Sequence, residues 1–210
     1  MTLILGCAVG NSVFQVSDRR LTNLNGVVGT DTQNKAVFLD GRVAVGYTGL
    51  AHIDGKSTDR WIAEVLHREF SKSADLKASF IGLSDAATTY FKSLRVGPRF
   101  KRQAFQAIGW VKANGESSLS PLILRVDNAL DANGDWENAA RDRFQLREHL
   151  LTCQAGPTIM SVGCACTARE KSSVARFVRR CSKRGEPAIV MESLIRSMLW
   201  LSAKHSSVLA

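Results

Sequence analysis

The chain has 210 residues, of which 45% are apolar and 22% charged, so it contains enough apolar material for one domain with a sizeable core. No stretch approaches the roughly 18–20 uninterrupted apolar residues that a membrane-spanning helix needs, and no basic segment precedes the apolar run at the N-terminus. We therefore expect a single cytoplasmic domain over residues 1–210, with no membrane as a partner.

The formal net charge of +9 is a bias that proteins binding nucleic acid or another acidic partner often have. The basic residues are concentrated in Arg95–Arg102 and Arg169–Arg184, and the second segment has the spacing of a solvated helix face. Because no nucleic-acid-binding motif is present, we do not expect nucleic acid as a partner. Five scattered cysteines and four histidines form no metal-binding pattern, so no metal and no cofactor is expected.

Short apolar segments predict two hairpins at the start of the chain. Gly10-Asn11 and Asp40-Gly41 are suitable turns, and a polar loop over Asn23–Gly29 separates the hairpins. The expected strands are Leu3–Val9, Val13–Val16, Lys35–Leu39 and Arg42–Tyr47. The second strand ends at Ser17-Asp18, so the first part of the chain is an antiparallel sheet.

Apolar residues at intervals of three and four then predict two helices, one starting after Ser57 or Thr58 and one over Leu76–Leu94. The remaining expected elements are strands at Ala104–Val111 and Leu122–Val126, a long loop and an edge strand within Asn128–Leu151, a strand at Thr158–Gly163, and helices at Ala168–Cys181 and Pro187–Ser202. Because the helices come in consecutive pairs, a repeated βαβ pattern is excluded. The expected fold class is α+β, a four-layer αββα sandwich with two antiparallel sheets between helix pairs.

Several short motifs occur in an order that is typical of one enzyme family. Thr2 opens the first strand, Ser17-Asp18-Arg19-Arg20 ends the second, Lys35 opens the third, and Gly46-Tyr47-Thr48-Gly49 leads into the paired helices. In these features the chain resembles the N-terminal-nucleophile hydrolases, and among them the proteasome β-subunits and their bacterial relatives. That family has the αββα architecture that the order of elements favours. The resemblance implies a threonine-type amide hydrolase, foremost a peptidase, that acts on a peptide or amide substrate after Met1 is removed.

The resemblance also implies a role for each residue of the site. Thr2 is the nucleophile and its α-amine is the base, Lys35 lowers the pKa of the Thr2 hydroxyl, and Asp18 keeps the lysine charged. These residue types suit the chemistry, because a threonine hydroxyl needs an adjacent base and a terminal amine with a pKa near ~7.7–8.0 can be neutral at working pH. A tight hairpin would bring the end of the second strand beside the start of the first.

An acyl-transfer intermediate also needs a backbone N–H that stabilises its oxyanion, and Gly46 and Gly49 are the two candidates. Ser17 and Cys164 are expected to support the site. Cys164 lies in Gly163-Cys164-Ala165, where the family has Gly-Ser-Gly, and a buried core thiol is the alternative interpretation.

Two alternatives to catalysis remain open. In the first, the chain is a non-catalytic subunit of a proteasome-like ring. Asp18 and Arg19 then form a structural ion pair, and Lys35 is a solvated loop lysine. In the second, weaker one, the chain is a basic scaffold that binds an acidic partner. The resemblance further implies a homo-oligomeric ring that receives unfolded substrate from an ATPase.

Overall fold

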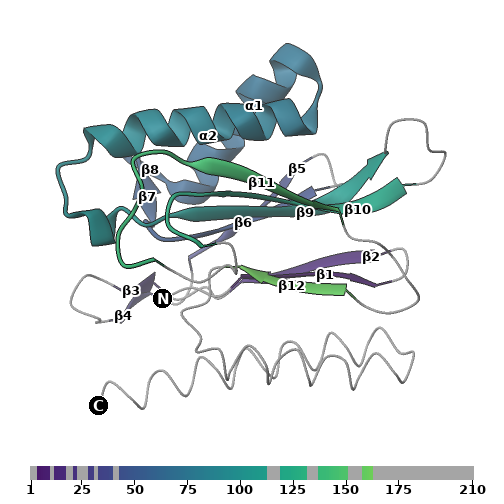
Figure 1. Ribbon diagram of the computed structural model, residues 1–210, viewed down its shortest axis with the longest axis horizontal. Coiled ribbons are helices and arrows are strands. Elements are labelled where there is room, and N and C mark those ends of the chain that lie inside the picture. Colours follow the sequence, from purple (N-terminus) through teal and green to yellow (C-terminus); the bar gives the residue numbers. More distant parts are fainter. Residues whose placement is uncertain are drawn as a thin grey trace.

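The computed structural model describes residues 4–9, 12–17, 21–22, 28–30, 33–39, 43–112, 119–131, 137–150 and 158–162. These ranges contain strands, two α-helices and one short 3-10 helix (Figure 1). The strands are β1 (Ile4–Val9), β2 (Ser12–Ser17), β3 (Leu21–Thr22), β4 (Val28–Thr30), β5 (Ala36–Leu39), β6 (Val43–Thr48), β7 (His52–Ile53), β8 (Lys56–Ser57), β9 (Ala104–Lys112), β10 (Leu119–Asp127), β11 (Gln145–Leu150) and β12 (Thr158–Val162). The helices are α1 (Thr58–Ser73), α2 (Leu76–Ser93) and η1 (Pro98–Phe100).

The strands form two main antiparallel sheets and two short hairpins. One main sheet has three strands in the order β12-β1-β2, and the other has five in the order β11-β10-β9-β6-β5. The pairs β3–β4 and β7–β8 are separate hairpins. Both main sheets bring together segments from distant parts of the sequence, since β12 pairs with β1 and β9 pairs with β6.

One face of the five-stranded sheet is apolar and is covered by α1 and α2 (Figure 1). Side chains alternate between the faces of a strand, so every second residue of each central strand reaches this core. The sheet contributes Val43, Val45, Tyr47, Phe105, Ala107, Leu122, Leu124 and Val126, and the helices contribute Trp61, Ile62, Val65, Leu66, Phe80, Leu83, Ala87 and Phe91. Full burial of a large apolar side chain contributes about 1.5–3 kcal/mol, so this core is the main source of stability in the described part.

A sharp junction sets the two helices side by side. Ala74 adopts a left-handed conformation (φ 52°) and donates its N–H to the Phe70 carbonyl at 2.7 Å, which ends α1. Asp75 follows in an extended conformation, and its side chain accepts the Lys77 N–H at 3.0 Å, which begins α2. Because only two residues connect the helices, they return antiparallel over the same sheet.

The opposite face of the five-stranded sheet carries the intervening residues and faces the three-stranded sheet (Figure 1). Ile4 of β1 is fully buried there, and a Cβ added at Gly46 of β6 would lie 3.2 Å from its Cγ2 atom. The described chain is therefore layered as helices, five-stranded sheet and three-stranded sheet. The second helix pair, expected at Ala168–Cys181 and Pro187–Ser202, lies outside the described residues.

Most of the expected elements up to residue 162 are present with boundaries shifted by a few residues, including β11 as an edge strand. Two expectations were incomplete. The Asn23–Gly29 segment is not only a loop, because Val28 pairs with Thr22 and Thr30 with Leu21. The β7–β8 hairpin was not expected. None of the helices in the described part of the chain is long and apolar enough to cross a membrane.

Candidate functional site

The start of β1 lies between the ends of two other strands. Ile4 pairs with Ser17, the last residue of β2, on one side and with Val162, the last residue of β12, on the other. The expected tight hairpin between the first two strands is confirmed by this register, in which Val9 pairs with Ser12. Thr2, Asp18 and Cys164 lie outside the described residues, whereas Ser17 is described and half-buried.

At Gly46 of β6 the five-stranded sheet lies close to the three-stranded sheet. A Cβ at this position would lie 2.7 Å from the Gln15 side chain and 3.2 Å from Ile4. With its amide oriented to satisfy both ends, Gln15 donates to the Ala44 carbonyl at 3.1 Å and accepts the Gly46 N–H at 2.7 Å. The Gly46 N–H is therefore already bonded inside the protein.

Lys35 precedes β5 on the strand pair that contains Gly46, because Ala36 pairs with Gly46. Its relative exposure is only 2%. The interpretation of Lys35 as a solvated loop lysine is therefore wrong. Lysine is almost never buried to this degree without a partner, because removing an ammonium group from water is strongly unfavourable.

Tyr47 fixes the backbone on which Lys35 lies. Its N–H donates to the Lys35 carbonyl at 3.3 Å, and its hydroxyl donates to the Asn34 carbonyl at 3.1 Å. Gln33 donates to the same hydroxyl at 3.4 Å. Burial of the ring raises the pKa of Tyr47 to about 12, so its hydroxyl stays protonated and remains a donor at neutral pH.

Gly49 directly follows β6, three residues beyond Gly46, and differs from Gly46 in two respects. Its φ is +115°, a value that side-chain-bearing residues rarely adopt, and it is exposed. Among the described residues, none accepts a hydrogen bond from the Gly49 N–H. Within the described part of the chain, Gly49 is thus the candidate oxyanion donor whose N–H is not already bonded.

The turn around Gly49 is held by Gln103, which directly precedes β9, and by Thr58, the first residue of α1. The Gln103 side-chain oxygen accepts the Leu50 N–H at 2.6 Å. On the other side, the Thr58 hydroxyl donates to the Leu50 carbonyl at 2.7 Å and the Thr58 N–H to the Ala51 carbonyl at 2.9 Å. These bonds fix the backbone that directly follows an exposed glycine.

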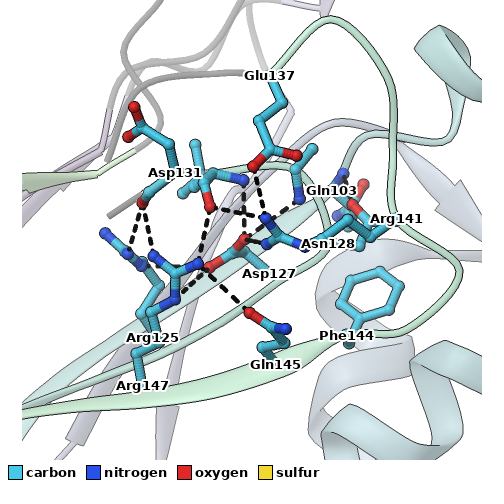
Figure 2. A network of polar contacts seen from close by, with 12 residues as sticks. Gln103, Arg125, Asp127, Asn128, Asp131, Glu137, Arg141, Phe144, Gln145 and Arg147 are labelled. Atoms are coloured by element: carbon cyan, nitrogen blue, oxygen red, sulfur yellow. Dashed lines mark hydrogen bonds and ion pairs between the residues drawn. The ribbon is translucent and has the colours of Figure 1, made fainter. Parts of the chain in front are cut away.

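A network of buried polar residues starts beside this turn (Figure 2). Asp127, at the end of β10, is fully buried and its Oδ1 atom accepts from Arg141 at 2.6 Å and from the Leu130 N–H at 2.8 Å. Arg125 Nε lies 3.3 Å from Asp127 Oδ2 as an ion pair without hydrogen-bond geometry. Burial lowers the pKa of Arg125, and the Asp127 carboxylate opposes that shift.

Sequence reasoning missed the buried residues of this network, because Asn128–Leu151 has no periodicity and Gln103 belongs to no motif. One signal was available: Arg125 and Asp127 alternate with Leu124 and Val126, a pattern that places both charged residues on one face of β10. The basic stretch before β9 is also partly structural, since Lys101 donates to the Phe91 carbonyl at 3.0 Å. In the part of the chain that the structure describes, no three His, Cys, Asp or Glu side chains are grouped as a metal site would require.

Comparisons with known proteins add little to this geometry. No protein-family model matches the chain, and no curated protein sequence matches it. Among solved structures it is similar to the crystal structure of eukaryotic HslV from Trypanosoma brucei, with 16% sequence identity over 93% of this chain and 89% of that one. The TM-score is 0.44. A likeness of this size carries no argument about fold or function. Any functional inference must therefore rest on the residues and contacts of this chain.

Proposed function

We propose that the chain, once Met1 is removed, is a threonine-type N-terminal-nucleophile amide hydrolase that acts on peptide substrates. One observation carries the proposal: the neighbours of the three predicted catalytic residues meet around Gly46. Ile4 pairs with Ser17 and packs on Gly46, and Gly46 pairs with Ala36, which follows the buried Lys35.

Chain length supports the same conclusion. Thr2 is two residues before Ile4, and two residues of extended chain span at most ~7 Å. Asp18 directly follows Ser17, and consecutive Cα atoms are ~3.8 Å apart. The proposal needs both side chains to reach Lys35, and the short tethers to Ile4 and Ser17 are compatible with that arrangement.

In the proposed reaction the Thr2 hydroxyl oxygen attacks the substrate carbonyl carbon while the Thr2 α-amine takes the hydroxyl proton. Lys35, kept charged by Asp18, favours the alkoxide by its positive charge. The protonated amine then delivers the proton to the leaving nitrogen as the C–N bond breaks, which leaves an ester on Thr2. Water attacks this ester, the amine accepts its proton, and release of the acid restores the hydroxyl.

The tetrahedral intermediate places a negative charge on the former carbonyl oxygen, which needs a preorganised donor. We assign that role to the Gly49 N–H. It is exposed and has no acceptor among the described residues, whereas the Gly46 N–H is bonded to Gln15. Ser17 and Cys164 remain supporting residues in this proposal.

The finer features implied by the resemblance belong to the same proposal. They are the αββα sandwich completed by the C-terminal helix pair, membership of the proteasome-like family, and a cytoplasmic homo-oligomeric ring. An ATPase that delivers unfolded substrate is the partner that such a ring would need.

The proposal is tested by incubating the Met1-free chain with a peptide epoxyketone or β-lactone and measuring adduct formation by intact mass. We expect one adduct, its loss in Thr2→Ala, and strongly slowed formation in Lys35→Met. Lys92→Met is the matched control because Lys92 is exposed on α2, and it should react like the unmodified sequence. Absence of any adduct on Met1-free protein would overturn catalysis and favour a non-catalytic subunit.

A further inference from the structure

The turn that carries Gly49 depends on one buried side chain from another strand. Gln103, which directly precedes β9, is fully buried, and its Oε1 atom accepts the Leu50 N–H at 2.6 Å. The same oxygen, together with the Arg102 carbonyl, occupies the space that a side chain at Gly49 would need. Gln103 therefore contacts the Gly49 backbone and bonds the next peptide group.

Gln103 is itself held by a reciprocal set of bonds with Asn128 (Figure 2). Its N–H donates to the Asn128 side-chain oxygen at 2.9 Å, and its carbonyl accepts the Asn128 N–H at 3.3 Å. The Asn128 amide nitrogen donates to the Lys101 carbonyl at 3.0 Å. The backbone of Gln103 is thus bonded on both sides before its side chain reaches Leu50.

Asn128 is in turn fixed by the charged network. The Arg141 N–H donates to the Asn128 carbonyl at 2.6 Å, and the Arg141 guanidinium pairs with Asp127 at 2.6 Å and with Glu137 at 2.8 Å. A continuous series of bonds therefore runs from a buried ion-pair cluster to the Gly49–Leu50 turn. Such a supporting shell limits how far a backbone donor can drift from its target.

We infer that Gln103 is a positioning residue that aims the Gly49 N–H at the oxyanion, an inference that rests on the proposed function. Gln103 is buried, so it acts through the turn and does not itself touch substrate. Its neutral amide matters as much as its shape. A buried carboxylate at the same place would put a negative charge beside the Gly49 N–H, which must stabilise the negative charge of the oxyanion.

Three variants of the full Met1-free chain test this inference by hydrolysis of a fluorogenic peptide amide. Gln103→Met keeps the side-chain volume but removes the acceptor of Leu50. We expect kcat to fall about 10–100-fold with KM nearly unchanged, because misplacement by about 1 Å costs up to ~10²-fold in rate. Gln106→Met is the matched control, since both amide atoms of buried Gln106 lack a hydrogen-bond partner among the described residues. Its kcat should stay within about twofold, since no hydrogen bond is lost.

The pH dependence of kcat in Gln103→Glu is a readout that a merely structural role of Gln103 would not change. The carboxyl keeps an acceptor for Leu50, and burial raises its pKa into the assay range. We expect kcat to fall as pH rises through that pKa, whereas the unmodified chain and Gln106→Met should show no such additional fall. A pH profile of Gln103→Glu that matches the unmodified chain overturns the inference.

A peptide vinyl sulfone separates aiming of the oxyanion donor from nucleophile activation. The Thr2 oxygen bonds to the alkene carbon β to the sulfone, the π bond breaks, and the hydroxyl proton ends on the carbon attached to the sulfone, so no carbonyl oxyanion forms. Gln103→Met should retain this labelling rate within about threefold while amide hydrolysis falls, given that only the second reaction uses an oxyanion donor. Equal losses in both reactions would overturn the positioning role.

Amide hydrogen exchange at Leu50 provides a test that does not require activity. Gln103→Met should lose protection at Leu50, and Gln106→Met should not. Retained protection in Gln103→Met overturns the inference whatever the activity. If the unmodified chain neither hydrolyses amides nor reacts with the vinyl sulfone, the proposed function fails, and a loss of protection then leaves Gln103 as a structural clamp without a catalytic role.

Discussion

Tyr47→Phe tests how the segment before Lys35 is held. The substitution removes only the hydroxyl that donates to the Asn34 carbonyl at 3.1 Å, while the buried ring stays in the core. Loss of one such hydrogen bond lowers the free energy of unfolding by about 0.5–1.5 kcal/mol. The lower part of that range is expected at pH 7 because Asn34 is exposed and water can replace the hydroxyl.

At high pH the unmodified chain should lose its advantage in free energy of unfolding over Tyr47→Phe. Burial raises the pKa of Tyr47 to about 12 from 10.0, so the unfolded chain loses this proton first as pH rises. The stability from the protonated hydroxyl is present below pH 10 and is lost between pH 10 and 12. At pH 11 the loss is about 1.4 kcal/mol in the unmodified chain and absent in the variant.

The assay is urea unfolding of both proteins at pH 7, 9, 10 and 11, with the difference between their free energies of unfolding plotted against pH. The difference isolates Tyr47, because every other titrating group is shared. We expect the unmodified chain to be the more stable below pH 10 and to lose that advantage near pH 11. A difference that stays constant from pH 7 to 11 would refute the assignment of a raised pKa to a buried hydroxyl.

Four further substitutions probe the other contacts. Asp127→Asn leaves Arg125 without its carboxylate partner, and we expect thermal unfolding to report a loss of about 3–5 kcal/mol; a loss below about 1 kcal/mol would contradict a buried ion pair. Gly49→Ala should lower the free energy of unfolding by about 1–3 kcal/mol and abolish labelling by the epoxyketone or β-lactone. The φ of +115° at this position is strained for alanine, and Gln103 fills the space that the added methyl group needs. Gly55→Ala, at φ +72° with open space around it, should be destabilised by about 1–2 kcal/mol but keep full labelling. Phe144→Ala should lower the free energy of urea unfolding by about 3–5 kcal/mol, because the Phe144 ring centroid lies 5.1 Å from that of Phe91 and 5.9 Å from that of Phe105. A change below about 1 kcal/mol would exclude Phe144 from the core.

The predictable parts of this fold are those in which local pattern and tertiary packing agree. The two helices repeat apolar residues every three or four positions, and most of these residues are buried on the sheet, although Phe70 near the end of α1 is exposed. The β7–β8 hairpin had a signal that was overlooked: Asp54-Gly55 is a typical two-residue turn, and both residues have positive φ. Its strands are only two residues long, which is too short for alternation to be recognised.

The site was harder to predict because its key contacts leave no local pattern. Gln103 bonds a residue 53 positions away and another 25 positions away, and neither separation relates to any motif. The segment after β10 is ordered by a side chain that bonds the backbone, with Asp127 accepting the Ala129 and Leu130 N–H groups. Such bonds replace the hydrophobic periodicity on which sequence interpretation depends.

The most direct test of the account is a crystal structure of the Met1-free chain, in which the distances among the Thr2 Oγ, Lys35 Nζ and Asp18 carboxylate atoms are measured. We predict that Lys35 Nζ lies within hydrogen-bond reach of both other groups, about 2.6–3.2 Å, with the Thr2 amine beside its own hydroxyl. A Lys35 ammonium turned away from Thr2, with ordered protein between them, would contradict the proposed catalytic site.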